Sequence, residues 1–172
     1  AERGRSVTPL ATSSAPSAAE RHSGLQGLLL NPLAAQEHLT PWCELASRSL
    51  DPNPFFAPDF LIPYMDNLGS NGLQLCVIRK TGSEDWLMAA PMARRKQGLA
   101  APATTSWATE YGPLGTPLLA PDAPAGTVPE FLSLAARSTG LPLIAFPYMP
   151  LDGATAKAFR STENWTISCG QE

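Results

Sequence analysis

The sequence predicts a mixed α/β (α+β) domain, in which a sheet is flanked by helices. Strand-like apolar runs, such as residues 73–80, alternate with helical apolar spacing, as in residues 41–49. This succession is typical of folds that layer a sheet against helices. A chain of 172 residues can bury a core of its own. Its 18 prolines and 13 glycines indicate short elements joined by many turns.

The amino-terminal segment differs in composition from the rest of the chain. Residues 1–24 are rich in Ala, Ser, Pro and Thr and hold almost no large apolar side chain, so we expect a disordered tail. The folded domain is expected to cover residues 25–172. The run "LQGLLLNPL" at its start predicts a first strand that ends at Pro32.

Two helices are expected next, joined by the proline-rich stretch "SLDPNPFFAPDFLIPYM". Thr40 is predicted to cap the first helix, since a proline follows it. The prolines of the joint push the residues before them out of the helical region, so Phe55 and Phe56 are expected on a stiff, extended connector. Asp59 is predicted to cap the second helix, and Gly69 is predicted to end it.

A hairpin and several short elements complete the chain. Residues 73–80 and 86–95 are predicted to pair, and Pro91 should make the second strand bulge or run along an edge. A strand is predicted from 103, and it continues into a Gly/Pro loop up to 119. A helix with a capping box at Thr127 and Glu130 should follow and end at Gly140. The last predicted elements are a buried strand over 141–149, a helix over 152–161 and a strand over 164–169.

Charge and cysteine content exclude several classes of protein. A net charge of -3 gives no electrostatic basis for binding nucleic acid or an anionic membrane surface, and no apolar run approaches the length of a membrane-spanning helix. Cys43, Cys76 and Cys169 lie far apart and show no C-x-x-C pairing, so we expect small buried side chains and neither a disulfide framework nor a metal site.

A short basic motif is the first candidate for chemistry. Arg95, Gly98 and Ala100 match the pattern R-x-x-G-x-A, with which acyl-CoA transferases hold the cofactor's pyrophosphate. Small residues let backbone N–H groups approach phosphate, and a following helix adds its dipole. The next residues, "APATTSW", disfavour a helix, so a basic turn after an edge strand is the alternative.

The dipeptide Glu110-Tyr111 is the second candidate. It ends a predicted strand just before a Gly/Pro loop. At an amine-acylating site, Glu110 could deprotonate the attacking ammonium and Tyr111 could protonate the departing thiolate. The alternative is a surface glutamate beside a tyrosine that packs over the loop.

Between residues 40 and 165 the chain carries four motifs in order: W-x-x-L, N-P-F-F-x-P-x-F-L, a hairpin with a proline, and Y-G-P-L-x-x-P-L-L. Their residues are Trp42, Leu45, Asn53, Pro54, Phe55, Phe56, Pro58, Phe60, Leu61, Pro91, Tyr111, Gly112, Pro113, Leu114, Pro117, Leu118 and Leu119. In this pattern the chain resembles the amino-terminal half of GNAT-superfamily acyltransferases of the cellulose-biosynthesis-associated type, which are double-GNAT proteins similar to peptidoglycan-bridge transferases.

The resemblance implies a GNAT-like mixed sheet in a single-lobe version, and acyl transfer from acetyl-CoA or another acyl-CoA to a small-molecule or glycan acceptor. It also implies a cytoplasmic setting in exopolysaccharide or envelope synthesis. In such proteins the second lobe usually carries the acyl-CoA loop. This chain would then hold the substrate side, with a second lobe or a second copy over an exposed sheet edge. A non-catalytic lobe that binds a glycan or envelope precursor is the alternative.

Overall fold

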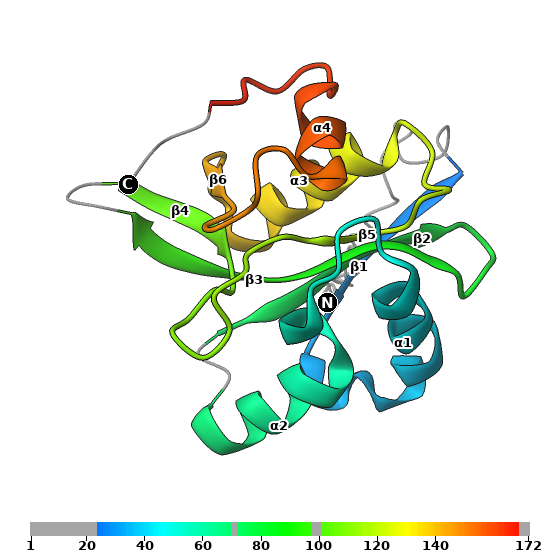
Figure 1. Ribbon diagram of the computed structural model, residues 1–172, viewed down its shortest axis with the longest axis vertical. Helices are drawn as coiled ribbons and strands as arrows, with labels where there is room; N and C mark the ends of the chain where they lie inside the picture. Colours follow the sequence, from blue (N-terminus) through cyan, green and yellow to red (C-terminus); the bar gives the residue numbers. More distant parts are fainter. Residues whose placement is uncertain (1–23, 70–71, 98–100, 169–172) are drawn as a thin grey trace, which may run out of the picture.

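The computed structural model describes residues 24–69, 72–97 and 101–168. The predicted tail, except Gly24, lies outside the described residues, as do Gly98, Ala100 and Cys169. Figure 1 shows a sheet with helices on both sides, which confirms the mixed α/β class. In chain order the elements are β1 (Leu25–Leu30), η2 (Pro32–His38), α1 (Leu39–Arg48), η3 (Pro54–Phe56), α2 (Pro58–Leu68), β2 (Gln74–Lys80), β3 (Trp86–Gln97), β4 (Ala101–Ser106), β5 (Leu118–Leu119), α3 (Thr127–Thr139), β6 (Ile144–Ala145) and α4 (Ala154–Arg160).

The sheet has six strands in the order β1-β2-β3-β4-β6, and β5 also pairs with β3. Its pairings are antiparallel except that of β4 with β6. Strands β4 and β5 lie along the same edge of β3, since Met92 faces Ser106 and Ala89 faces Leu118. The chain therefore leaves this edge after β4, forms the 107–117 loop, and returns as β5.

The helices form two outer layers. In Figure 1, α1 and α2 lie on one side of the sheet, and α3 and α4 lie on the other. Leu75 to Ile78 of β2 and Leu87 to Ala90 of β3 are completely buried, as expected for strands covered on both faces. On the α1 side, the Trp42 ring stacks on Trp86 with their centroids 6.0 Å apart.

The prediction for Pro91 was wrong, because β3 is an interior strand and the register shift lies at Ile78/Arg79 instead. Pro91 faces the start of the 107–117 loop, and its carbonyl accepts a hydrogen bond from Trp107 N at 2.9 Å. The N and O atoms of a strand residue point to the same side. The N atom of Pro91, which carries no hydrogen, therefore points toward the loop, where the hydrogen-bond ladder of the sheet is already interrupted.

Three capping predictions were wrong. Helix α1 begins at Leu39, directly after the η2 turn, so the chain is already helical before Thr40. Helix α2 begins at Pro58 and places Asp59 in its first turn, because proline sets the backbone angle without a side-chain cap. Helix α3 begins at Thr127, whose hydroxyl is buried and finds no partner among the described residues.

Other predictions of local structure were confirmed or corrected. Gly69 and Gly140 end their helices with positive φ, as predicted. Phe55 and Phe56 lie in a 3-10 turn rather than an extended connector. The strand predicted over 141–149 shortens to β6, and residues 164–168 form no strand.

The cysteine prediction was confirmed for Cys76, which is buried, and was wrong for Cys43, which is exposed. Among the described residues, none of the helices is both long enough and apolar enough to cross a membrane.

Candidate functional site

Asn53 connects the two motifs that carry the resemblance. Its buried side chain donates from Nδ2 to Leu114 O at 3.1 Å and to Thr116 O at 2.8 Å, while Oδ1 accepts from Phe55 N at 3.1 Å. One side chain therefore caps the η3 turn and fixes the 107–117 loop. The N-P-F-F and Y-G-P-L segments, distant in sequence, form a single structural unit.

The 107–117 loop has further anchors at its centre. Ser106 Oγ donates to Gly115 O at 2.7 Å, and Gly115 N donates to Pro147 O at 2.9 Å. A Cβ at position 115 would lie 2.3 Å from Pro147 O, so only glycine permits this close approach. The loop is thus held between β4 and the segment that follows β6.

Arg95 is engaged with the same loop. Its guanidinium carbon lies 4.0 Å from the centroid of the Trp107 ring, and Nη1 donates to Ala108 O at 3.1 Å. A cation–π contact and a hydrogen bond together fix the guanidinium. The next described element is strand β4, not a helix. The turn at 98–100 lies outside the described residues, so the assignment of Arg95, Gly98 and Ala100 to a cofactor stays a prediction.

Glu110 and Tyr111 occupy an exposed turn of the loop. Thr109 and Gly112 pair across this turn through reciprocal backbone hydrogen bonds of 3.0 and 3.2 Å. Tyr111 is 63% exposed, and Glu110 is exposed as well. A Cβ at Gly112 would lie 3.2 Å from Phe55 Cβ, so the turn packs closely on the η3 joint. The two candidate catalytic side chains are therefore accessible on a fixed backbone.

An aromatic row continues from this joint along α2. The Phe55 and Phe60 rings meet edge to face with centroids 5.1 Å apart, and Phe60 stacks on Tyr64 at 5.8 Å. All three side chains are half-buried. Rings that are packed on one side and open on the other can receive an apolar or sugar face of a ligand at little entropic cost. We call Phe55, Phe60, Tyr64 and the 109–112 turn the aromatic platform.

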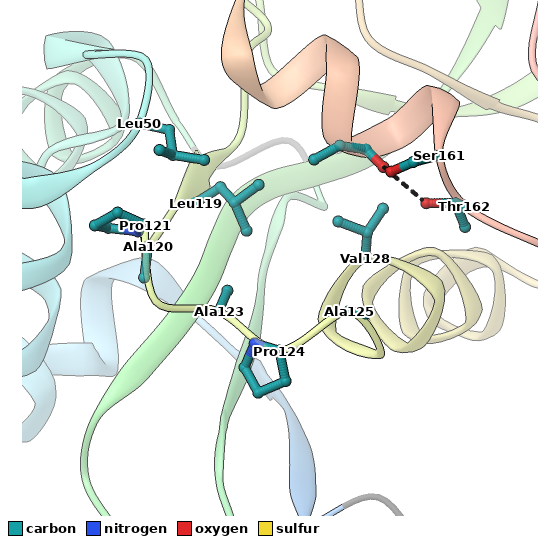
Figure 2. Close-up of a pocket in the computed structure, with 11 residues that line it drawn as sticks. Leu50, Leu119, Ala120, Pro121, Ala123, Pro124, Ala125, Val128, Ser161 and Thr162 are labelled. Atoms are coloured by element: carbon teal, nitrogen blue, oxygen red, sulfur yellow. Dashed lines mark hydrogen bonds between the residues drawn. The ribbon is translucent and has the colours of Figure 1, made fainter.

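The strand-to-helix layout that a phosphate loop needs occurs at 120–126, between β5 and α3. Figure 2 shows this connector beside a small hollow of about 140 Å³. Two of its N–H groups are already used, since Ala120 N donates to Leu87 O and Ala123 N donates to Ala120 O. Proline at 121 and 124 supplies no donor. The prolines and these two hydrogen bonds reduce the number of N–H groups that could face an anion.

The same connector carries a carboxylate. Asp122 forms a hydrogen-bonded ion pair with Arg48, and Lys80 lies 3.8 Å away. The hydrogen bond from Arg48 lowers the pKa of Asp122, so this carboxyl stays ionised at neutral pH. Asp122 therefore already pairs with the cations nearest the connector, Arg48 and Lys80, which leaves them less free to pair with a pyrophosphate.

No three His, Cys, Asp or Glu side chains among the described residues are grouped so that they could hold a metal ion. Comparisons with models of protein families, with curated proteins and with solved structures find no match to this chain.

Sequence analysis identified the two motifs but missed the role of Asn53. An Asn that precedes proline is a common helix cap, and this signal was present in "NPFF". The hydrogen bonds that Asn53 donates to Leu114 O and Thr116 O span 61 and 63 positions of the chain. They depend on tertiary structure, so no local sequence pattern predicts them.

Proposed function

We propose that this chain is the acceptor-side lobe of a GNAT-like acyltransferase. It would bind an acceptor that carries an amine or a hydroxyl, such as a glycan, while a second lobe supplies the acyl-CoA. The observation that carries this proposal is the exposed Glu110-Tyr111 turn, which is fixed against the half-buried rings of the aromatic platform. A site of this kind presents polar groups beside ring faces on a rigid backbone.

Two described segments of this chain could be considered for holding the pyrophosphate of acyl-CoA, and their contacts support placing the acyl-CoA on a second lobe. Arg95 is engaged with Trp107, and the 120–126 connector has internal hydrogen bonds, two prolines and Asp122. Neither arrangement suits a multiply charged anion. For this reason we assign the acyl-CoA to a second lobe rather than to these residues.

In this proposal the acceptor amine forms a bond to the acyl carbon as the carbon–sulfur bond of the acyl-CoA breaks. Glu110 accepts the proton that the amine loses, and Tyr111 contacts the acceptor and donates a proton to the departing thiolate. The resemblance further suggests exopolysaccharide or envelope synthesis in the cytoplasm. A binding lobe without catalytic residues is the alternative, and it would use the same aromatic platform without any role for Glu110.

Calorimetric titration of the full chain tests the proposal with three probes: acetyl-CoA, a glucosamine hexamer with free amines, and the N-acetylated hexamer. We expect the glucosamine hexamer to bind, the acetylated hexamer to bind about tenfold more weakly, and acetyl-CoA to give no heat at millimolar concentration. The preference for free amines should disappear in Glu110→Gln, because the carboxylate that pairs with the ammonium is removed.

Tyr111→Ala should weaken binding of both hexamers, and Tyr148→Ala is the matched control because both tyrosines are 63% exposed. Micromolar binding of acetyl-CoA would overturn the assignment of an acceptor-side lobe. Equal affinity for both hexamers in the natural sequence, unchanged in Glu110→Gln, would favour the non-catalytic binding lobe.

A further inference from the structure

A second surface, remote in sequence from the 109–112 turn, contains a larger hollow than the one beside the 120–126 connector. The β6–α4 groove has a volume of about 710 Å³, and its walls are residues 142–149, the inner face of α4 and residues 165–168. This volume is in the range of sites that take small organic ligands. All of these residues belong to the described part of the chain.

The interior of the groove is apolar and firmly packed. Phe146 contacts Phe159 of α4 with ring centroids 4.8 Å apart, and it also faces Phe131 of α3 at 6.5 Å. Leu143 and Leu151 at the rim are 49% and 48% exposed. A cluster of open apolar side chains over a rigid aromatic floor indicates a binding surface rather than chance exposure.

One charge borders this apolar lining. Arg160, an exposed residue in the last turn of α4, is the only charged one among the described residues that line the groove. Among the same residues its guanidinium has no ion-pair or hydrogen-bond partner. In the described part of the chain, the groove therefore combines a long apolar wall with one exposed cation at one place.

The mouth of the groove is formed by an unusual backbone conformation. Tyr148 has φ of 55°, a conformation that few residues other than glycine adopt, and its ring is exposed. The preceding carbonyl, Pro147 O, is fixed by the hydrogen bond from Gly115 N. Strained residues of this kind are often found at binding sites.

We propose that the β6–α4 groove binds a single-chain amphiphile with an anionic head, its hydrocarbon chain lying on the Phe146 and Phe159 floor and its carboxylate paired with Arg160. The apolar lining recognises the chain, and the lone guanidinium selects an anion over a neutral or cationic head. This site lies apart from the aromatic platform, so the proposal of an amphiphile site does not depend on the proposed function.

Calorimetry with decanoate, decanol and decylammonium, at concentrations below micelle formation, tests this proposal on the full chain. We expect saturable binding of decanoate, about tenfold weaker binding of decanol, and no binding of decylammonium. Arg160→Gln should bring decanoate to the level of decanol and leave decanol unchanged. Ile167→Glu, which adds a carboxylate to a 39% exposed position in the groove, should abolish decanoate binding.

Arg137→Gln is the matched control, since Arg137 also lies in the last turn of its helix but does not line the groove. Its affinity for decanoate should equal that of the natural sequence. Equal binding of decanoate and decanol by the natural sequence would overturn the proposal, as would decanoate binding that survives Ile167→Glu. A chain that is dimeric in sedimentation and binds no decanoate would assign the groove to a second copy instead.

Discussion

At the scale of single residues, two thiols lie in opposite environments. Burial raises the pKa of the Cys76 thiol to about 12. Cys43 is exposed, and its pKa is raised by partial desolvation and by the charge of Asp59. At mildly alkaline pH we expect iodoacetamide to modify Cys43 while Cys76 stays unmodified until the chain unfolds, because the thiolate is the reactive form. Peptide mass spectrometry measures both sites, and native Cys76 that reacts as fast as Cys43 would contradict the buried placement.

Asp51 gives a pH-dependent prediction. Partial burial raises the pKa of its carboxyl, but hydrogen bonds from the N–H groups of Thr155 (2.6 Å) and Ala154 (3.2 Å), together with Lys157, outweigh this and lower it overall. A lowered pKa stabilises the fold above the unfolded-state pKa, and this stabilisation is lost as the pH falls through the folded-state value.

Asp51→Ala should therefore lower the free energy of unfolding by about 1 to 2 kcal/mol at neutral pH. The difference should begin to shrink below about pH 4, where the carboxyl of the unfolded chain takes up a proton, and should continue to shrink as the pH falls through the lower pKa of the folded chain. Urea denaturation across the pH range measures the difference in the free energy of unfolding. Asp152→Ala, which removes an exposed carboxylate, is the control. A difference that is constant with pH would show that the charge of Asp51 contributes nothing.

At the scale of elements, the 107–117 loop owes its position to Asn53. Asn53→Ala removes three hydrogen bonds and leaves two backbone carbonyls without their donor. We expect the free energy of unfolding to fall by about 2 to 3 kcal/mol. Asn67→Ala, which removes one exposed hydrogen bond to Pro63 O, should stay within about 0.5 kcal/mol of the natural chain. Thermal and urea denaturation compare the two, and equal effects would contradict the anchoring role.

Element positions followed from the sequence better than element ends did. Helical spacing of Trp42 and Leu45 located α1, and glycines located the ends of α2 and α3. The predicted helix starts were wrong at Thr40 and Asp59, which do not cap their helices, because a preceding turn and a proline had already set the backbone. The strand predicted over 141–149 was too long and was wrongly expected to be buried, since these residues are half-buried or exposed. An apolar run does not distinguish a buried strand from an irregular segment at the surface.

At the scale of the whole molecule, the sequence predicted the fold class but not the connection between distant parts. The hairpin of β2 and β3 is local and was predicted correctly. The parallel pairing of β4 with β6 and the use of one β3 edge by both β4 and β5 depend on contacts across the chain. The same holds for the candidate site: Glu110 and Tyr111 were identified by type, whereas the packing of their turn on the η3 joint, through Gly112 and Phe55, required the structure.

The hydrogen bonds that fasten α4 to Asp51 join residues 103 and 104 positions apart. During synthesis, β1 to β4 can pair as they leave the ribosome, since their partners are close in sequence. The face of β1, β2 and β3 on which α3 packs stays uncovered until residues 127–139 have emerged, and α4 is fastened to Asp51 only after Thr155 has emerged. A chaperone that protects nascent chains would find its target there, on the partly assembled sheet.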